Sequence, residues 1–587
     1  MRAYRFCGLT VMVVAMGLTA YDPAVGQTPA RRAQQQKRLQ RLAQAQKKAE
    51  DDRKAAEEKK KDDAKKAADL AKLEKALPAP AKLPTGPVTK NPAELAQMID
   101  EAIEKKLVAE KIPPSPTCTD SEFLRRAYLD ITGVIPPADK ARTFIDSRDP
   151  DKRAKLIDEL LDSSNFGRHQ ADIWASLIIQ KTSDNRRVDF TPFREWLAAQ
   201  FNQNKPWSET VSDMVAATGD YEKVPAAAFY MSNNTVDKMT DQVSKLFLGV
   251  SIQCAQCHDH KFEDWKQKEY WSFTQFFMKV SIGGGAGAKI GGDAMVNETG
   301  RINRKKSPLP EAAMNLPATF LRDGFAKLNP SSPYRPKLAA WLTNEKNPYF
   351  AKAMVNRVWS QLFGTGFCNP TDMGPNETPS HPELLANLAH QFGGGGFDLK
   401  NLVRAVCLSQ TYQRSSKAIA GNEKDATNFS HMAVKIMSPE MLFDSTMAVT
   451  GGPAAGPAGR GQRAQKAQKP KVTKGVPPNR RDQFVNFFLA GADSTNNTEY
   501  EAGIPQALKL MNSRQMTNPA AVRTILGFRP VKKDAIEKLY LLTLSRRPTA
   551  DEVTRMSDFI NKSPVGLEGY ADLLWALLNC SEFTMVR

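Results

Sequence analysis

Residues 93–112 read AELAQMIDEAIEKKLVAEKI. Apolar side chains recur there three and four positions apart, which is the spacing of one face of an α-helix; they are Leu95, Met98, Ile99, Ala102, Ile103 and Leu107. The same spacing predicts helices over 123–131, 154–161, 173–179 and 193–201, with glycine and proline between them. We therefore expect a mainly α-helical fold with Trp174, Trp196 and Trp207 in its core.

The first residues predict export. Arg2 and Arg5 precede an apolar run over 6–20, and Ala24-Val25-Gly26 provides a small-x-small cleavage site, so residues 1–26 are interpreted as a signal peptide. An uncleaved membrane anchor is the alternative. No later segment reaches the roughly 20 apolar residues that a spanning helix needs. The mature protein is therefore expected in the periplasm or outside the cell, without a transmembrane helix.

Residues 27–92 are expected to form a charged stalk and a Pro-rich linker. The stretch 31–76 consists almost entirely of Ala, Lys, Arg, Glu, Asp and Gln, most of which favour helix. Its leucines are too sparse for the seam of a coiled coil, so we expect a solvated single helix or a disordered stalk. Leu77-Pro78-Ala79-Pro80 interrupts it, and packed contacts are expected only after residue 90.

The net charge of +18 is concentrated in two segments. Residues 28–76 carry +7 and residues 451–481 carry +8, and once the +1 of the signal region is removed the remaining chain carries only +2. A nearly neutral body argues against a specific nucleic-acid partner. The two basic segments are interpreted as solvated linkers or as contacts to anionic envelope polymers and membrane surfaces.

The chain after residue 92 is expected to form two helical domains. The first spans 93–281, a Gly-rich junction covers 282–329, and the second spans 330–587 with a disordered basic insert at 451–481. Residues 128–139 and 540–551 resemble each other, since each has Tyr-Leu followed by Pro, Ala and Asp at equal offsets. This echo predicts a helix, a tight turn and a second helix in both places.

One short motif carries recognisable chemistry. Cys254-Ala255-Gln256-Cys257-His258 matches the C-x-x-C-H attachment site of a c-type haem. In a helix, Cys254, Cys257 and His258 would share one face, which suits haem c. The second axial ligand would then be Met278, His169 or no residue of the protein.

Two other interpretations of this segment stay open. In a loop, Cys254, Cys257 and His260 could gather a zinc ion, with Asp264 or a distant histidine as the fourth ligand. Alternatively, Cys254 and Cys257 could form a disulfide knuckle, which is natural in an oxidising compartment. His258 and His260 are therefore both candidate metal ligands.

Other polar motifs have simpler explanations. Ser380 is expected to cap a helix, with Glu383 completing a capping box around His381. Arg357 could bind an anion, although an interior arginine that holds loop carbonyls or a carboxylate is commoner.

A cation in the loop after Phe367 is a further possibility, through Asp372, Asn376 and Glu377. Among the cysteines Cys118, Cys368, Cys407 and Cys580, three pairings are possible. We expect Cys368–Cys407, because these two lie closest in sequence.

Many motifs resemble, in order, a planctomycete exported cytochrome-like family, domain of unknown function 1549 followed by domain of unknown function 1553. The resemblance covers roughly 93–587 and rests on LRRAYLDITG at 124–133, NKPW at 204–207, LGVSIQCAQCHDHKF at 248–262, NRVW at 356–359, FGTG at 363–366, SHPEL at 380–384, TYQRSS at 411–416, IPQAL at 504–508, LSRRP at 544–548 and LLWALLN at 573–579. It implies export and a cytochrome-like motif, with no settled activity. Ile173 stands before Trp174 where the family leads us to expect histidine, and the loop between the domains is short. Both departures weaken the transfer of a second histidine ligand.

The sequence thus favours an exported c-type haem protein that transfers electrons. One alternative is a non-redox envelope protein, structural or binding, whose segment 254–260 is a zinc or disulfide knuckle. Another is a metal-dependent hydrolase of extracellular polysaccharide.

Overall fold

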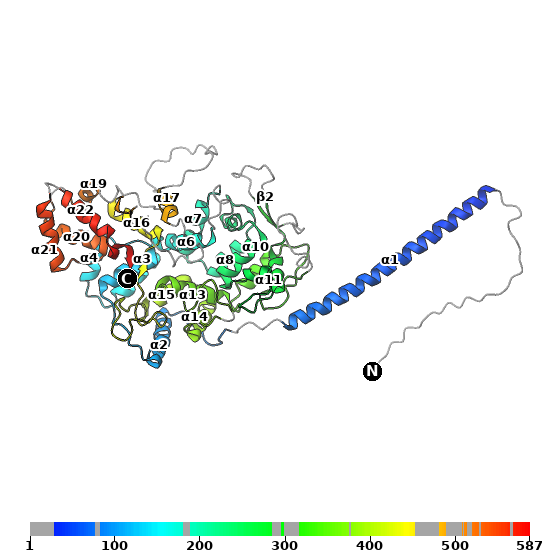
Figure 1. Cartoon of the computed structure of the whole chain (residues 1–587), viewed down its shortest axis with the longest axis horizontal. Coiled ribbons are helices and arrows are strands. Elements are labelled where there is room, and N and C mark those ends of the chain that lie inside the picture. The colour runs from blue at the N-terminus through cyan, green and yellow to red at the C-terminus, as the bar shows by residue number, and fades with distance from the viewer. Residues whose placement is uncertain are drawn as a thin grey trace. The chain divides into compact units, whose positions relative to one another are not determined.

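The computed structural model describes residues 29–76, 83–179, 188–283, 295–298, 316–374, 377–451, 480–488, 508, 510–512, 519–527, 530–563 and 567–587 (Figure 1). The predicted signal peptide and most of the predicted insert lie outside these residues. The chain divides into two units, residues 1–77 and 78–587, each of which is described by itself. Among the described helices, none has the length and apolar character required to cross a membrane.

The described residues of the first unit form the helix α1, which spans Pro29–Ala76 (48 residues). Its described side chains are exposed. Pairs four residues apart face each other along the helix, as in Arg53–Glu57 and Lys54–Glu50 at 3.5 and 3.0 Å. Such pairs each stabilise an isolated helix by about 0.2–0.5 kcal/mol, which suits a helix without an apolar face.

The second unit, the body, is mainly α-helical as predicted. Its helices are α2 Pro92–Glu110, α3 Asp120–Thr132, α4 Ala138–Asp146, α5 Lys152–Asp162, α6 Ser164–Ile178, α7 Thr191–Asn202, α8 Trp207–Ala216, α9 Ala228–Ser232, α10 Val236–Val243, α11 Gln267–Thr274, α12 Arg335–Leu342, α13 Phe350–Phe363, α14 Pro382–Gly394, α15 Leu399–Leu408, α16 Pro439–Thr450, α17 Arg480–Phe488, α19 Pro519–Leu526, α20 Lys532–Leu544, α21 Ala550–Lys562, α22 Glu568–Asn579 and α23 Ser581–Thr584. The five helices expected from periodicity correspond to α2, α3, α5, α6 and α7.

Short strands join distant parts of the body. β1 (Gly219–Asp220), β3 (Met295–Glu298) and β2 (Val280–Gly283) form an antiparallel sheet in that order, and β4 (Lys435–Ile436) pairs with β5 (Met585–Val586). β2 lies at the edge of the predicted Gly-rich junction, and β3 lies within it. Glu298 on β3 accepts a hydrogen bond from the Nε of Arg335 at 3.1 Å, and both side chains are buried. The described part of the junction is therefore fixed to the start of α12.

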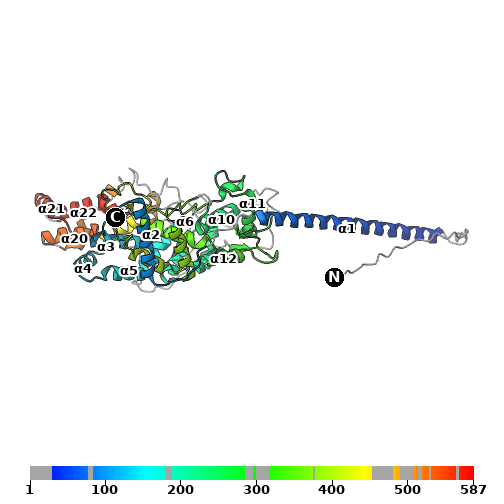
Figure 2. The same cartoon turned by 90° about the horizontal axis from the view of Figure 1, so that it is seen from below.

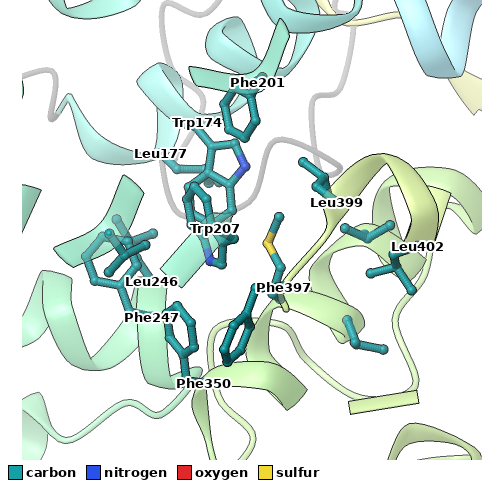
Figure 3. Close-up of a cluster of buried hydrophobic side chains, with 14 of the residues drawn as sticks. Trp174, Leu177, Phe201, Trp207, Leu246, Phe247, Phe350, Phe397, Leu399 and Leu402 are labelled. Carbon is teal, nitrogen blue, oxygen red and sulfur yellow. The ribbon is translucent and has the colours of Figure 1, made fainter. Parts of the chain in front are cut away.

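The largest hydrophobic core contains residues from both predicted domains (Figure 3). Trp174 of α6 and Trp207 of α8 are buried, with ring centroids 4.3 Å apart. Phe350 of α13 and Phe397 lie in the same cluster, 5.3 Å from each other. Trp196 is only partly buried at its edge. Burial of these aromatic surfaces joins residues on both sides of the predicted junction into one core.

A second hydrophobic core contains residues from the two similar segments, 128–139 and 540–551. α3 and α4 form one helix–turn–helix and α20 and α21 the other, with left-handed residues Gly133 and Ser545 ending the first helix of each. α4 lies beside α20 in both views (Figure 2). Arg125 of α3 donates hydrogen bonds to the carbonyl oxygens of Thr543 and Phe583 at 2.8 and 2.7 Å. The predicted motifs are thus present and contact each other.

Two expectations about order are wrong. Residues before 91 do pack, because the Thr89 amide donates to Gln391 Oε1 at 2.8 Å and Gln391 Nε2 donates to the Pro87 carbonyl at 2.9 Å. Val88 lies against Gly394 at the end of α14, where a Cβ would come within 2.5 Å of it. The insert ends earlier than residue 481, since Arg480 begins α17 and Arg481 forms buried ion pairs.

Candidate functional site

The C-x-x-C-H segment lies between α10 and α11, at the end of the body opposite α20 to α22 (Figure 1, Figure 2). It forms a 3-10 turn over Gln253–Gln256, so the α-helical alternative is wrong. The Gln256 carbonyl accepts from Trp271 Nε1 at 3.0 Å, and the Cys257 carbonyl accepts from Gln267 Nε2 at 2.7 Å. These side chains of α11 thus donate hydrogen bonds to carbonyl oxygens that backbone amides would bond in a continuing helix.

The thiols of this segment are accessible. Cys254, Cys257 and His258 are exposed, whereas Ala255 between them is buried and anchors the turn. All six described cysteines are free, so the disulfide between Cys254 and Cys257 is not formed. Two exposed free thiols at this spacing retain the chemistry that thioether attachment requires.

The expected Cys368–Cys407 pairing is also wrong. Cys407 lies in the buried face of α15, where burial raises the pKa of its thiol. Cys368 instead accepts from Asn356 Nδ2 at 3.6 Å, and burial raises the pKa of its thiol to about 12. Both thiols are therefore held protonated in separate environments. Cys118 and Cys580 are free as well.

The two histidines of the segment differ in which ring nitrogen is available. His258 Nδ1 lies 2.6 Å from the Asp259 carbonyl oxygen, and because a carbonyl only accepts, Nδ1 carries the proton. The lone pair of His258 is then on Nε2. His260 is the opposite, since its Nδ1 accepts from the amides of Phe262 and Glu263 at 3.2 and 2.9 Å. The lone pair of His260 is used within its own turn.

This difference separates the metal hypotheses. Metal-binding histidines commonly donate their second ring N–H to a carbonyl or carboxylate, which is the arrangement of His258. Asp264, the suggested fourth zinc ligand, pairs with Lys266 at 3.1 Å. Among the described residues, no three His, Cys, Asp or Glu side chains gather as a metal group. The geometry therefore favours His258 over His260 as a ligand.

The suggested second axial ligands lie inside the protein. Met278 follows a 3-10 turn (Gln275–Phe277) and is 2% exposed within the main core. His169 of α6 is 6% exposed and lines a cavity. Neither presents its side chain on the surface where His258 stands.

The remaining predicted sites have structural roles or lie outside the described residues. The predicted Ser380 cap is wrong, because the N-cap of α14 is His381, which makes no side-chain cap bond. Pro382 is the first residue of the helix, and Ser380 Oγ lies 3.0 Å from His381 Nδ1. Asp372 accepts a hydrogen bond from the Ser251 amide at 3.3 Å, which connects its loop to the residues just before the C-x-x-C-H turn.

Within the suggested cation loop, Asn376 lies outside the described residues. The backbone amide of Glu377 bonds to the Gly374 carbonyl at 3.0 Å.

A cavity that sequence reasoning missed lies between α6, α13 and residues 433–441. Its volume is about 430 Å³. The apolar part of its wall includes Ile173, Trp174, Leu177, Met354 and Met441, and the polar part includes Asp130, His169, Asp172, Arg357, Lys435 and Glu440. Of the polar residues, the sequence singled out His169 and Arg357. The others come from distant segments and belong to no common motif.

Two of the cavity's carboxylates have strong partners. Asp130 accepts from Lys435 Nζ at 2.6 Å and from the Tyr412 hydroxyl at 2.9 Å. Asp172 accepts from Arg481 at 2.6 Å and from Arg194 at 3.4 Å. Burial alone would raise the pKa of Asp172, but these guanidinium groups lower it below its usual value. Both carboxylates are therefore compensated by cationic partners, and Asp172 stays ionised at pH 7.

The other titratable groups are shifted towards their neutral forms. Burial lowers the pKa of His169 to about 4, so its imidazole is neutral at pH 7. The Cβ of any residue replacing Gly133 would lie 2.4 Å from His169 Nδ1, which shows how closely the ring is packed. Burial, followed by repulsion from Asp172, raises the pKa of the Glu440 carboxyl.

Comparison with known families agrees with the motifs. Residues 98–281 match a family described as Protein of unknown function (DUF1549), and residues 334–560 match one described as Protein of unknown function (DUF1553). No curated protein and no solved structure matches the chain significantly. The cavity has walls from both matched regions, with α6 in the first and α13 in the second. The chain thus belongs to the proteins that carry a domain of unknown function 1549 followed by a domain of unknown function 1553.

Proposed function

We propose that this chain is an exported protein that carries haem c on Cys254, Cys257 and His258 and takes part in electron transfer. The observation that supports it most is the orientation of His258, whose Nδ1 donates to the Asp259 carbonyl at 2.6 Å. That bond fixes the tautomer with a free Nε2 lone pair before any iron arrives. Haem c supplies one-electron chemistry when bound, and the protein supplies its ligation and surroundings.

The residues around the turn fit attachment at the surface. Cys254 and Cys257 are exposed and free, so an enzyme that joins haem to thiols can reach both. Gln267 and Trp271 hold the backbone of the turn from α11, which limits the motion of the thiols. Phe262 is 83% exposed in the same loop, so the site offers apolar surface for part of a porphyrin.

The periplasmic or secreted location belongs to this proposal, because haem is joined to such motifs outside the cytoplasm. The contact of α1 and of the basic insert with anionic envelope polymers also stays a proposal. It is supported by the exposed charged side chains of α1. A zinc knuckle is less well supported, because His260 uses its Nδ1 lone pair to accept two backbone amides.

The test is expression of the full chain in a host that matures c-type cytochromes. We expect haem to remain attached after denaturation and to stain for peroxidase activity, and a pyridine haemochrome spectrum typical of two thioether links. Cys257→Ser should lose most of the stain, and His258→Ala should alter the visible spectrum. Cys580→Ser and His260→Ala are the matched controls, and both should keep the haem. A colourless wild-type protein from such a host would overturn the proposal.

A further inference from the structure

The guanidinium of Arg357 is the least compensated charge in the cavity wall. It is 8% exposed, and its Nε has no hydrogen-bond partner among the described residues. One terminal nitrogen donates to the carbonyls of Pro370 and Lys245 at 3.3 and 3.4 Å, which are long hydrogen bonds. Among the described residues, no carboxylate lies within 4 Å of it. Burial lowers the pKa of Arg357 to about 10, which still leaves it charged at pH 7.

An interior arginine elsewhere in the body shows what a structural role looks like. Arg125 is 4% exposed and also lacks a carboxylate partner within 4 Å among the described residues. Its two terminal nitrogens donate to the carbonyls of Thr543 and Phe583 at 2.8 and 2.7 Å. The Nε of Arg125 also lacks a hydrogen-bond partner among the described residues, so the two arginines differ in their terminal nitrogens. Arg125 makes short bonds to two helices, whereas Arg357 makes long bonds and lines the cavity.

An unpaired buried charge is costly, and arginine cannot relieve the cost by losing its proton. The cavity beside Arg357 is large enough to hold a compensating group. A volume of about 430 Å³ is at the lower end of the range of small-molecule sites, roughly 300–1,000 Å³. Arg357 lines this cavity, and an anion placed there could accept a charge-assisted hydrogen bond from its guanidinium group.

The rest of the wall restricts what this anion can be. Among the described residues of the wall, the other lysine or arginine is Lys435, which already pairs with Asp130, so a second negative charge on the ligand would find no free cation. Trp174, Leu177 and Met354 give the cavity an apolar side, and the Trp174 ring centroid lies 5.5 Å from the Arg357 guanidinium carbon. A flat or cyclic apolar group could lie there while its charged end meets Arg357.

We propose that this cavity is a binding site for a small organic monoanion, whose carboxylate or sulfo group pairs with Arg357 and whose apolar body contacts Trp174, Leu177 and Met354. This site is distinct from the C-x-x-C-H turn, and its existence does not depend on haem. The ligand would carry one negative charge on a compact ring or a short chain. It would bind where residues of both matched regions meet.

The experiment is a titration of the full chain with benzoate, cyclohexanecarboxylate and benzenesulfonate, followed by calorimetry and by the melting temperature. Benzamide and inorganic sulfate are the probes that lack, respectively, the charge and the apolar body. We expect at least one organic anion to bind and to raise the melting temperature, with benzamide and sulfate at least tenfold weaker. The carboxylates and the sulfonate together show which charged group the site prefers.

Two variants make the test specific. Arg357→Met should weaken binding of the organic anion at least tenfold and leave the melting temperature of the free protein unchanged or higher, because it removes an uncompensated buried charge. Arg125→Gln is the matched control, and it should lower the melting temperature while the remaining folded protein binds the anion as the wild type does. The proposal is overturned if none of the three organic anions binds, if Arg357→Met keeps their binding, or if Arg357→Met lowers the melting temperature as much as Arg125→Gln does.

Discussion

Arg481 should be one of the most important residues for the stability of the body, although it lies at the end of a segment that the sequence assigns to a disordered insert. Its guanidinium contacts Asp172 at 2.6 Å and Asp444 at 2.8 Å. Both carboxylates are almost fully buried, at 7% and 5% exposure. Arg481→Met would leave two buried carboxylates without their main partner.

Removing one partner of a buried ion pair costs about 3–5 kcal/mol. The lower end applies here, because Arg194 stays 3.4 Å from Asp172 and Arg168 stays 3.5 Å from Asp444. With an unfolding entropy of about 2.1 cal/mol/K per residue over the roughly 500 residues of the body, a loss of about 3 kcal/mol lowers the melting temperature by about 3 °C.

The difference in melting temperature between the wild type and Arg481→Met should depend on pH in a defined direction. Burial opposes ionisation of Asp172, but Arg481 and Arg194 lower its folded-state pKa below its usual value. A carboxylate of this kind contributes stability above the unfolded pKa of about 3.9 and loses it as the pH falls through the folded pKa. The difference in melting temperature between wild type and Arg481→Met should therefore be fully present above about pH 4 and narrow only below it, as the pH falls through the folded-state pKa of Asp172.

The assay is thermal unfolding followed by circular dichroism at several pH values. Arg480→Met is the matched control, since Arg480 is the exposed neighbour in α17 and should change the melting temperature by less than about 1 °C. Equal melting temperatures for the two variants at pH 7, or a gap that does not narrow in acid, would refute the reasoning.

Two further predictions use the same measurement. Replacing residues 452–479 by a short Gly-Ser linker should change the melting temperature by less than about 2 °C. Extending the deletion through Arg481 should lower the melting temperature by about 3 °C more. If the shorter deletion lowers the melting temperature as much as the longer one, residues 452–479 are themselves structural. His169 is neutral in the folded state because burial lowers its pKa to about 4. Its contribution to stability is complete above the unfolded pKa of about 6.5 and is lost as the pH falls towards 4, by at most about 3 kcal/mol. His169→Gln should flatten the decline of stability over that pH interval, and an unchanged slope would count against a neutral buried imidazole.

The helical body could be predicted because its signals are local. Apolar spacing identified α2, and Pro with an acidic residue in the first turn identified α4 and α21. The left-handed ends at Gly133 and Ser545 follow the two Tyr-Leu motifs, as the echo implied. These features depend on residues within one or two turns of each other, which periodicity detects.

The turn at Cys254 was harder to predict, because side chains of another helix decide its conformation. Trp271 and Gln267 lie 15 and 10 residues from the carbonyls to which they donate, so these contacts are not visible in the motif itself. The tautomers of His258 and His260 likewise depend on which backbone group faces each ring. The motif indicated which atoms were present, and the fold determines which of them are available.

The cavity could not be predicted, because no short segment contains it. Asp172 and Arg481 are 309 positions apart, and Asp130 and Lys435 are 305 apart. For Arg357 the sequence favours an interior role over anion binding. Its lack of a carboxylate partner among the described residues depends on the contacts of the folded chain.

The cavity and the C-x-x-C-H turn are connected through one distorted helical turn. Ser244–Leu248 is a π-helical turn, a form that often occurs at functional sites. The carbonyl of Lys245 accepts from Arg357, while Lys245 Nζ donates to Gln253 Oε1 at 3.2 Å, next to Cys254. Lys245 therefore contacts the cavity wall through its backbone carbonyl and the start of the cysteine segment through its side chain, so the π-helical turn lies against both sites.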